Sequence, residues 1–529
     1  MRSSVLPVLI VAALVAPAGA DDFILTVGGG YSPSGNQVSL EKNVLFFGRV
    51  LEETAPAGVR HTILFADGDD PRRDVQYLDV ESPLPRALEL LARVFNETDH
   101  QFERYRDHEI PNAADAATTR NLIDWFDAVG RTLTGDDRLI IYVTAHGGAS
   151  DDKKRPRNTR LHLWDNDDIT VEQFAGELDR IAPEVPVVIV MVQCYSGGFA
   201  DLIFEKANDS NGATRHNRCG FFATSHDRVA AGCTPDIDEA DYREYSSAFW
   251  AAILGRSRVG EPVANADYDG DGVVSFAEAH ASVLIHSDTI DIPVATSDAF
   301  LRSFSREKPG SSTLLANQAN RRREPSGATS EESQAVVALK PFDPLTSDAD
   351  VSALLAVADP VGRAVVEQLS ERLGLIRSDR AAEARELAAG IEEERKRLRG
   401  QIGRLNRDSR RARGEIEKAV LAEWPELAGH WNPEARRLVS EEPDAIVALI
   451  ESHPRFDRWE ELDSEVHELE ERRSDLERQW VKCQRLLATL ETIALAHNLP
   501  LTADSGLILR YESLCEAESA SLVRRANAK

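Results

Sequence analysis

Short, continuous apolar runs alternate with amphipathic segments through residues 21–305. Runs without polar interruption are typical of strands buried on both faces of a parallel sheet, and the amphipathic segments are typical of covering helices. Strands are expected at 23–27, 61–66, 139–144, 186–192 and 220–224, and helices at 44–51, 122–133, 171–181 and 247–254. The pattern predicts an α/β fold with a mostly parallel sheet flanked by helices.

A different pattern fills residues 346–529, where apolar side chains recur at heptad spacing. One seam position holds Leu462, Leu469, Leu476, Cys483 and Leu490. The other holds Trp459, Val466, Trp480, Leu487 and Ala494, with Arg473 as the one exception. An earlier segment repeats the spacing at Ile391, Leu398, Leu405 and Ala412. A continuous helix between the two is excluded by Pro425, Pro433, Pro443 and Pro454. We expect an all-α region built on an antiparallel coiled-coil hairpin with an irregular tip, although a helical bundle or a dimer seam fits the same spacing.

Two segments lie outside both patterns. Arg2, an apolar run at 5–15 and the sequence Ala18-Gly19-Ala20 predict a secretory signal peptide cleaved after Ala20. The alternative, an N-terminal membrane anchor, normally has a longer apolar run. Residues 306–345 are polar and rich in turn formers, which predicts a linker.

The expected parts are therefore a signal peptide at 1–20, an α/β unit at 21–305, a linker at 306–345 and a helical region at 346–529. The mature protein is expected to be secreted or periplasmic, in a compartment that permits disulfides.

Composition narrows the classes of partner. The 529 residues include 61 lysines and arginines against 89 aspartates and glutamates, a formal net charge of −28. Such a chain is repelled by phosphate backbones, so we expect no nucleic-acid partner. Five cysteines are too few for a disulfide scaffold. If Cys194 is a free nucleophile, Cys219 and Cys233 are candidates for one disulfide and Cys483 and Cys515 for another, although the heptad position of Cys483 also fits a plain core residue.

Residues that carry chemistry follow two of the predicted strands. His146 and Gly147 come after the run at 139–144, and Cys194 comes after the run at 186–192. Because the carboxyl ends of parallel strands meet at one edge of a sheet, we expect His146 and Cys194 to form a catalytic dyad. The imidazole would deprotonate the thiol and then protonate the leaving amine, and the N–H groups of Gly147 and Cys194 would form an oxyanion hole. Taken alone, each residue is also compatible with a purely structural role.

These segments resemble the two active-site strands of the caspase-like cysteine peptidases, and most closely the legumain branch, which includes the transamidase that attaches lipid anchors. The family's His-Gly pair matches His146-Gly147, and its Cys-x-Ser-Gly motif matches residues 194–197. Gln193 precedes the cysteine as in caspases, whereas Val192 stands where legumains usually have an acidic residue. The resemblance covers about residues 21–300. It implies a caspase-like fold and endopeptidase or transpeptidase chemistry on a protein or peptide substrate.

The resemblance also implies that the loop after the strand at 220–224 helps to build the specificity pocket. The candidate pocket residues are Ser225, His226, Asp227, Arg228, Asp241 and Glu244. Carboxylates would select basic substrate side chains and an arginine would select acidic ones. Solvated loop charges fit the same pattern, so the sequence leaves the residue specificity open. The basic loop at 153–157 is interpreted as an exposed loop, with a mobile flap or a processing site as alternatives.

Residues 267–278 match the twelve-residue calcium loop of an EF-hand. The expected oxygen ligands are Asp267, Asp269, Asp271, the carbonyl of Val273, Ser275 and Glu278. Calcium takes six to eight oxygen ligands, and Gly272 permits the bend that turns them inward. Gly260 and Pro262 disfavour a regular entering helix, so we expect one structural calcium ion (Ca²⁺) rather than a sensor pair. A metal-free acidic turn is the alternative.

The sequence as a whole predicts an exported cysteine endopeptidase with a His146–Cys194 dyad. A transpeptidase would use the same nucleophile, with an amine instead of water resolving the thioester. A catalytically silent scaffold is the alternative from another class, with the helical region binding partner proteins or self-associating. The helical region is also a candidate inhibitory or targeting element, with the linker cut on activation.

Overall fold

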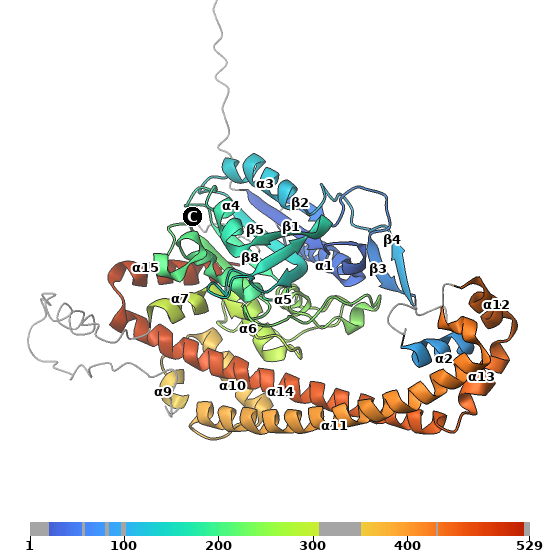
Figure 1. Cartoon of the computed structure of the whole chain (residues 1–529). Helices are drawn as coiled ribbons and strands as arrows, with labels where there is room; N and C mark the ends of the chain where they lie inside the picture. The colour runs from blue at the N-terminus through green and yellow to red at the C-terminus, as the bar shows by residue number, and fades with distance from the viewer. Residues whose placement is uncertain are drawn as a thin grey trace, which may run out of the picture.

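The computed structural model describes residues 21–55, 59–79, 84–96, 102–305, 351–429 and 432–522. The signal peptide expected at 1–20 and the linker expected at 306–345 lie outside these residues. Within the described ranges, none of the helices combines the length and apolar character needed to cross a bilayer. The described chain forms an α/β unit and a long helical arm, residues 380–502, that runs along one side of it (Figure 1).

The α/β unit is built on a sheet with strand order β10-β9-β8-β5-β1-β2. All neighbours in this order pair in parallel except β10, which is antiparallel to β9. The strands are β1 (Asp22–Gly29), β2 (Arg60–Phe65), β5 (Arg138–Gly148), β8 (Val187–Met191), β9 (Arg218–Phe222) and β10 (Val294–Ala295). Every side chain of β1, β8 and β9 is buried, as the uninterrupted apolar runs predict. The predicted α/β class and mostly parallel sheet are confirmed.

Helices flank this sheet as the sequence predicts. They are α1 (Val38–Thr54), α3 (Thr119–Ala128), α4 (Val171–Leu178), α5 (Tyr245–Leu254), α6 (Phe276–His286) and α7 (Thr296–Phe304). Helix α5 packs on α1 and α6, whereas α3 packs on α4. The helix expected at 44–51 begins earlier, at Val38. Its first turn was missed because Ser39 and Glu41 are polar, which suggested solvent, whereas the structure buries both.

Several short elements were not predicted. They are β3 (Val75–Leu78), α2 (Arg86–Phe95), β4 (Glu103–Arg106), β6 (Arg160–Leu163) and β7 (Asp167–Thr170). Strands β3 and β4 pair with each other, and β6 pairs with the end of β5 and with β7. These strands are only four residues long, so periodicity gives almost no signal for them.

The C-terminal region is helical, as predicted. Its helices are α9 (Val351–Leu355), α10 (Pro360–Leu373), α11 (Arg380–Glu423), α12 (Pro433–Glu441), α13 (Pro443–Glu451), α14 (Phe456–Thr502) and α15 (Ser505–Glu518). Helices α11 and α14 lie antiparallel and pack along their length, so the heptad seam pairs two helices of one chain (Figure 1). Pro433 and Pro443 each begin a helix of the tip, where a missing N–H costs nothing.

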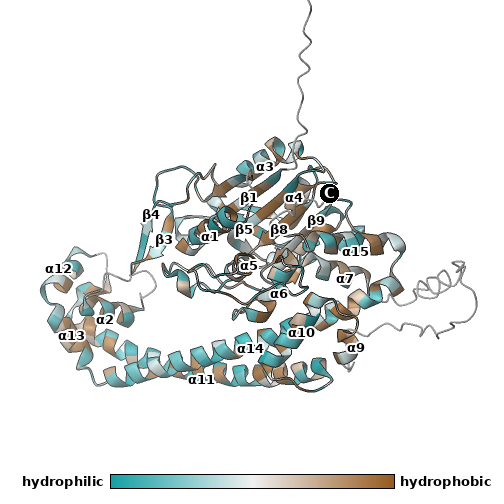
Figure 2. Cartoon of the chain, turned by 180° about the vertical axis from the view of Figure 1, so that it is seen from behind, coloured by the Kyte–Doolittle hydropathy of each residue, from teal (hydrophilic) through white to brown (hydrophobic). Residues whose placement is uncertain are grey.

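The two predicted parts share hydrophobic cores at both ends of the arm. At the tip, α2 of the α/β unit buries Leu90 and Val94 against Ile416 and Ile446. At the other end, Leu495 and Leu499 of α14 belong to the core of the sheet. The middle of the arm between these cores is mainly hydrophilic (Figure 2). The arm is therefore attached to the α/β unit at both ends.

Candidate active site

The ends of β5 and β8 meet at one edge of the sheet, as the dyad requires. Val143 of β5 pairs with Met191 of β8, and His146 and Cys194 each follow three residues later. A Cβ on Gly147 would lie 2.2 Å from the carbonyl oxygen of Cys194, so only glycine permits this approach. The structure thus brings the backbones that carry the two residues into direct contact.

His146 is held by the loop at 30–37. Its Nε2 lies 2.8 Å from the carbonyl oxygen of Gly35 and 2.9 Å from Oε1 of Gln37. Both partners are acceptors, so Nε2 carries the proton and Nδ1 keeps the lone pair. Tyr31 packs edge-on against the ring, with centroids 5.4 Å apart. Burial lowers the pKa of His146, so the imidazole is a neutral, oriented base.

Cys194 is held by a different loop, residues 225–234. Its Sγ accepts a hydrogen bond from the Ala230 N–H at 3.3 Å. Burial raises the pKa of the thiol, and the nearby carboxylate of Asp291 raises it further, so the thiol is neutral. Within the part of the chain that the structure describes, no hydrogen bond joins the thiol to His146. The two side chains share a strand edge, but each is held by its own loop.

The expected oxyanion hole has one available donor. The N–H of Cys194 has no acceptor among the described residues, whereas the next N–H, that of Tyr195, donates to the carbonyl of Arg228. Tyr195 has a φ of 61°, a left-handed turn that follows Cys194 directly. Gly147, the second expected donor, belongs to β5 and pairs with Leu161 of β6. The Cys194 N–H is therefore the group best placed to bind a developing oxyanion.

The predicted pocket residues around Arg228 are spread over a partly buried loop. Arg228 Nη2 lies 3.2 Å from Oε1 of Glu477, and its guanidinium stacks on Trp480, both residues of α14. Ser225 donates a 2.6 Å hydrogen bond to Asp227, which lowers the pKa of that carboxyl. Burial lowers the pKa of His226. The charge of Arg228 is thus already neutralised by the arm.

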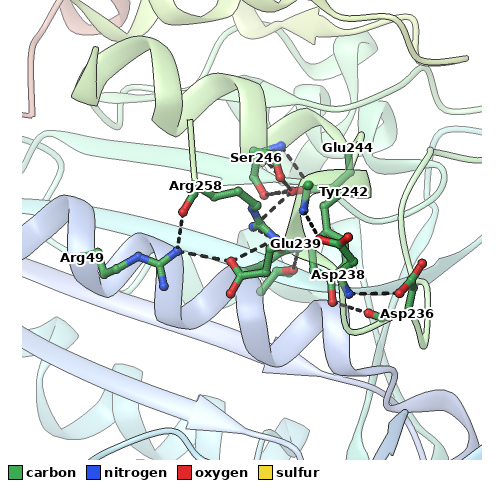
Figure 3. Close-up of polar contacts among 12 residues, drawn as sticks. Arg49, Asp236, Asp238, Glu239, Tyr242, Glu244, Ser246 and Arg258 are labelled. Atoms are coloured by element: carbon green, nitrogen blue, oxygen red, sulfur yellow. Dashed lines mark hydrogen bonds and ion pairs between the residues drawn. The ribbon is translucent and has the colours of Figure 1, made fainter. Parts of the chain in front are cut away.

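The two acidic candidates further along differ in their surroundings. Asp241 is exposed in a short turn. Glu244 is buried, and its carboxylate accepts from the N–H groups of Ser246 and Ser247 at the start of α5 (Figure 3). Arg258 lies 3.9 Å from the same carboxylate and stacks on Tyr242. Glu244 therefore caps a helix, where an anion is stabilised by the helix dipole.

Sequence reasoning missed two buried charges behind Cys194. Asp291, with 0% of its surface exposed, accepts from the Ala231 N–H at 2.7 Å, beside the residue that binds the thiol. Arg485 of α14 is 1% exposed and donates to the carbonyls of Asp291 at 2.9 Å and Ser287 at 2.8 Å. The arm thus supports the Cys194 loop through Asp291. An arginine among the apolar residues of α14 was the only signal in the sequence.

A second histidine lies next to the first. His162 of β6 stands directly opposite His146 in the antiparallel pairing, and its Nδ1 is hydrogen-bonded to the Asp168 carboxylate. Tyr31 packs on both rings, which fixes their relative orientation. The hairpin of β6 and β7 was not predicted, so this neighbour could not be placed from the sequence.

The predicted calcium loop forms a tight acidic turn. The carboxylates of Asp267, Asp269 and Asp271 come within 4.8 Å of one another, and Oδ1 of Asp267 is buried without a partner. Glu278, expected as a ligand, instead accepts from the N–H groups of Tyr268 at 2.7 Å and Ser275 at 2.9 Å. The structure brings together three of the six expected ligand residues. It places Val273 and Ser275 in the same loop, with Ser275 capping α6.

The suggested disulfides are absent from the described residues, where all five cysteines are free thiols. Cys219 is buried in β9 near Cys515 and Glu518, whose charges add to the rise that burial causes in its pKa. Cys233 has Cys194 and Glu244 as its neighbours instead, and burial raises the pKa of its thiol to about 12. The suggested partners face different neighbours, which explains why proximity in sequence misled.

Comparisons with known proteins add little to this geometry. No family model matches the chain, and no curated protein matches its sequence. Among solved structures, a structural-genomics target from Geobacter sulfurreducens is similar at 13% identity, covers 53% of this chain and 92% of its own, and superposes with a TM-score of 0.29. A similarity at this level of sequence identity and TM-score assigns no family to the chain.

Proposed function

We propose that this protein is a caspase-like cysteine endopeptidase in which Cys194 is the nucleophile and His146 the general base. The supporting observation is the orientation of His146. Its Nε2–H is bound by Gly35 and Gln37, so Nδ1 keeps its lone pair. The backbone that follows His146 lies against the backbone of Cys194. In nucleophile–base pairs, acceptors that bind one ring nitrogen of the histidine hold the proton there and leave the other nitrogen free to act as the base.

The reaction starts from two neutral groups, because burial favours the uncharged forms of both. When a peptide carbonyl reaches Cys194, the thiol proton passes to Nδ1 of His146 and Sγ attacks the carbonyl carbon. The tetrahedral oxyanion accepts a hydrogen bond from the Cys194 N–H. Collapse gives a thioester and releases the amine, which takes the proton from His146. Water, activated by the same imidazole, then hydrolyses the thioester and restores the thiol.

The arm is proposed to shape the substrate-binding side of this site. Arg228 belongs to the loop that holds Cys194, and it is bound by Glu477 and Trp480 of α14. Trp480 is also covered by Arg395 of α11, so both long helices contribute to the contact. A polypeptide substrate that reaches Cys194 would therefore lie next to the arm as well as the sheet.

We further propose that the turn at 267–278 binds calcium and that the chain is exported after cleavage at Ala20. The partnerless Oδ1 of Asp267 supports the first point. Raising the thermal midpoint with calcium, and losing that rise in Asp267→Asn, would test it. Finding Asp21 as the first residue of the mature protein would test the second.

The enzymatic proposal is tested by cleavage. The purified chain is incubated with a peptide library, and the products are identified by mass spectrometry. We expect hydrolysed peptides that disappear with Cys194→Ala and with His146→Ala, and persist with Cys515→Ala as the control. Ligated products would indicate a transpeptidase. Products that persist in Cys194→Ala, or none from any preparation, would contradict the proposal.

A further inference from the structure

A second acidic cluster lies beyond the end of β2, away from the EF-hand-like turn. Asp67, Asp74 and His108 each offer a ligand atom, and these atoms lie within 4.8 Å of one another. Asp74 is completely buried, at 0% exposed, and its Oδ1 has no partner. Both carboxylate oxygens of Asp67 are also buried without a partner among the described residues. Buried polar atoms are nearly always satisfied, so three such oxygens in one cluster require an explanation.

Among the residues that the structure describes, no cationic side chain forms an ion pair with Asp67 or Asp74. Arg106 is partly buried, and its guanidinium is bound by both carboxylate oxygens of Glu41, which is completely buried. Arg72 is exposed and pairs with Asp70 at 2.8 Å. Both ring nitrogens of His108 are hydrogen-bonded within the fold, because Nδ1 accepts from the Ile110 N–H and Nε2 bonds the Gly68 carbonyl. Glu41 therefore has its cation inside the fold, whereas the two aspartates do not.

We propose that Asp67 and Asp74 bind one hard divalent cation, calcium or magnesium, at the end of β2. Carboxylate oxygens are the ligands that both ions prefer. With calcium–oxygen bonds of about 2.4 Å, ligands on opposite sides of the ion lie about 4.8 Å apart, which the cluster satisfies. The left-handed turn at Ala66, with a φ of 39°, aims Asp67 into the cluster, and His108 borders it by holding Gly68. Water would complete the coordination shell.

The site is linked to the loop that orients His146. Asn36 donates from Nδ2 to the carbonyl oxygen of Asp74 at 3.2 Å and to its carboxylate at 3.3 Å. Asn36 lies between Gly35 and Gln37, the two residues that bind His146 Nε2. A cation that fixes Asp74 would thus also fix the acceptors of His146. This link rests on the proposed function, whereas the binding of the cation does not.

The test measures binding rather than activity. The background variant is Asp267→Asn with Asp269→Asn, which removes the other acidic turn. Isothermal titration with calcium in one arm and magnesium in the other should show one ion per chain in this background. Adding Asp67→Asn and Asp74→Asn should abolish that binding, whereas adding Asp69→Asn, an exposed change in the same loop, should not. A background that binds neither ion, or binding that survives loss of both aspartates, would overturn the inference.

Thermal unfolding gives a second readout that a misfolded variant cannot imitate. In chelator, Asp74→Asn should raise the thermal midpoint, because it removes repulsion from Asp67. In excess of the binding cation, the same change should lower the midpoint relative to the unchanged chain. A shift of the same sign under both conditions would show a carboxylate pair with a structural role only and would overturn the inference. Because neither readout uses catalysis, failure here is distinct from failure of the peptidase proposal.

Discussion

His146 and Cys194 lie on adjacent strand ends, yet they are held by segments from distant parts of the chain. His146 is oriented by Gly35 and Gln37, near the N-terminus of the α/β unit. Cys194 is held by Ala230, and the neighbouring Ala231 is held by Asp291, which Arg485 of the C-terminal arm contacts. The comparison shows how a single site can depend on two independent supports.

Each support ends in a buried carboxylate, and the two differ in how the charge is balanced. Burial raises the pKa of Asp74 and of Asp291 to about 7 in each case. Asp291 lies beside the buried guanidinium of Arg485, which favours its ionised form. Asp74 faces Asp67 instead, which opposes ionisation. The cysteine side therefore has a cation beside its carboxylate, whereas the histidine side has a second carboxylate in the corresponding place.

The largest effect is expected from removing the arginine of the cysteine side. Arg485→Met leaves several carbonyls and the Asp291 carboxylate without their cation, which should lower the free energy of unfolding by about 3–5 kcal/mol. Denaturant unfolding measures this. Arg472→Met, an exposed change on the same helix, should cost less than about 1 kcal/mol. If the two changes lower the free energy of unfolding equally, the buried contacts of Arg485 do not stabilise the fold more than an exposed ion pair does.

The histidine side should show its imbalance in the pH dependence of stability. The folded pKa of Asp74 is raised to about 7, above its unfolded value, so its contribution is fully present at low pH and is lost as pH rises through about 7. In chelator, this loss should amount to about 2–4 kcal/mol between roughly pH 4 and pH 8. Asp74→Asn should remove the part of this pH-dependent loss that comes from Asp74 and leave the part that comes from Asp291. An unchanged pH profile of unfolding in the variant would contradict this account.

A smaller effect on the same side is expected from Gln37. Replacing it with alanine removes one of the two acceptors of His146 Nε2 and should lower kcat about tenfold with little change in stability. Gln37→Glu separates positioning from packing. A carboxylate there should raise the pKa of His146 and move the acidic limb of the activity profile to higher pH. A profile that does not move would mean that Gln37 has no influence on the histidine.

The smallest effect is expected where the arm contacts the loop at 225–234, which holds Cys194. Glu477→Gln removes the anion beside Arg228, which should cost less than about 1 kcal/mol because the pair is partly exposed. With its charge no longer balanced, Arg228 should increase cleavage beside acidic residues about two- to fivefold relative to neutral ones. A competition between matched peptides measures the ratio. An unchanged ratio would place Arg228 outside the substrate contact.

Sequence reasoning succeeded where the information is local. The apolar runs before His146 and Cys194 located both strands, and parallel pairing then brought the strand ends together. It failed where contacts join distant segments. Nothing in residues 86–95 shows that α2 packs into the tip of the arm, and nothing near Asp291 points to Arg485.

The two acidic clusters show the same limit. The turn at 267–278 was recognised from its spacing, which reports ligands that are close in sequence. Spacing did not reveal that Glu278 is already bound by backbone N–H groups. Asp67, Asp74 and His108 have no motif, and only the fold shows that they converge and that three carboxylate oxygens of the two aspartates lack partners among the described residues.

The central claim, that Cys194 acts with His146 on a peptide carbonyl, is tested most directly by covalent labelling. Peptidyl acyloxymethyl ketones with Asn, Asp, Arg or Lys next to the reactive group are incubated with the mature protein, with and without calcium, and the modified residue is located by mass spectrometry. The account predicts labelling at Cys194 that is absent in Cys194→Ala and strongly slowed in His146→Ala. Labelling of another cysteine, or none with any probe, would contradict the account and favour a non-catalytic role for the chain.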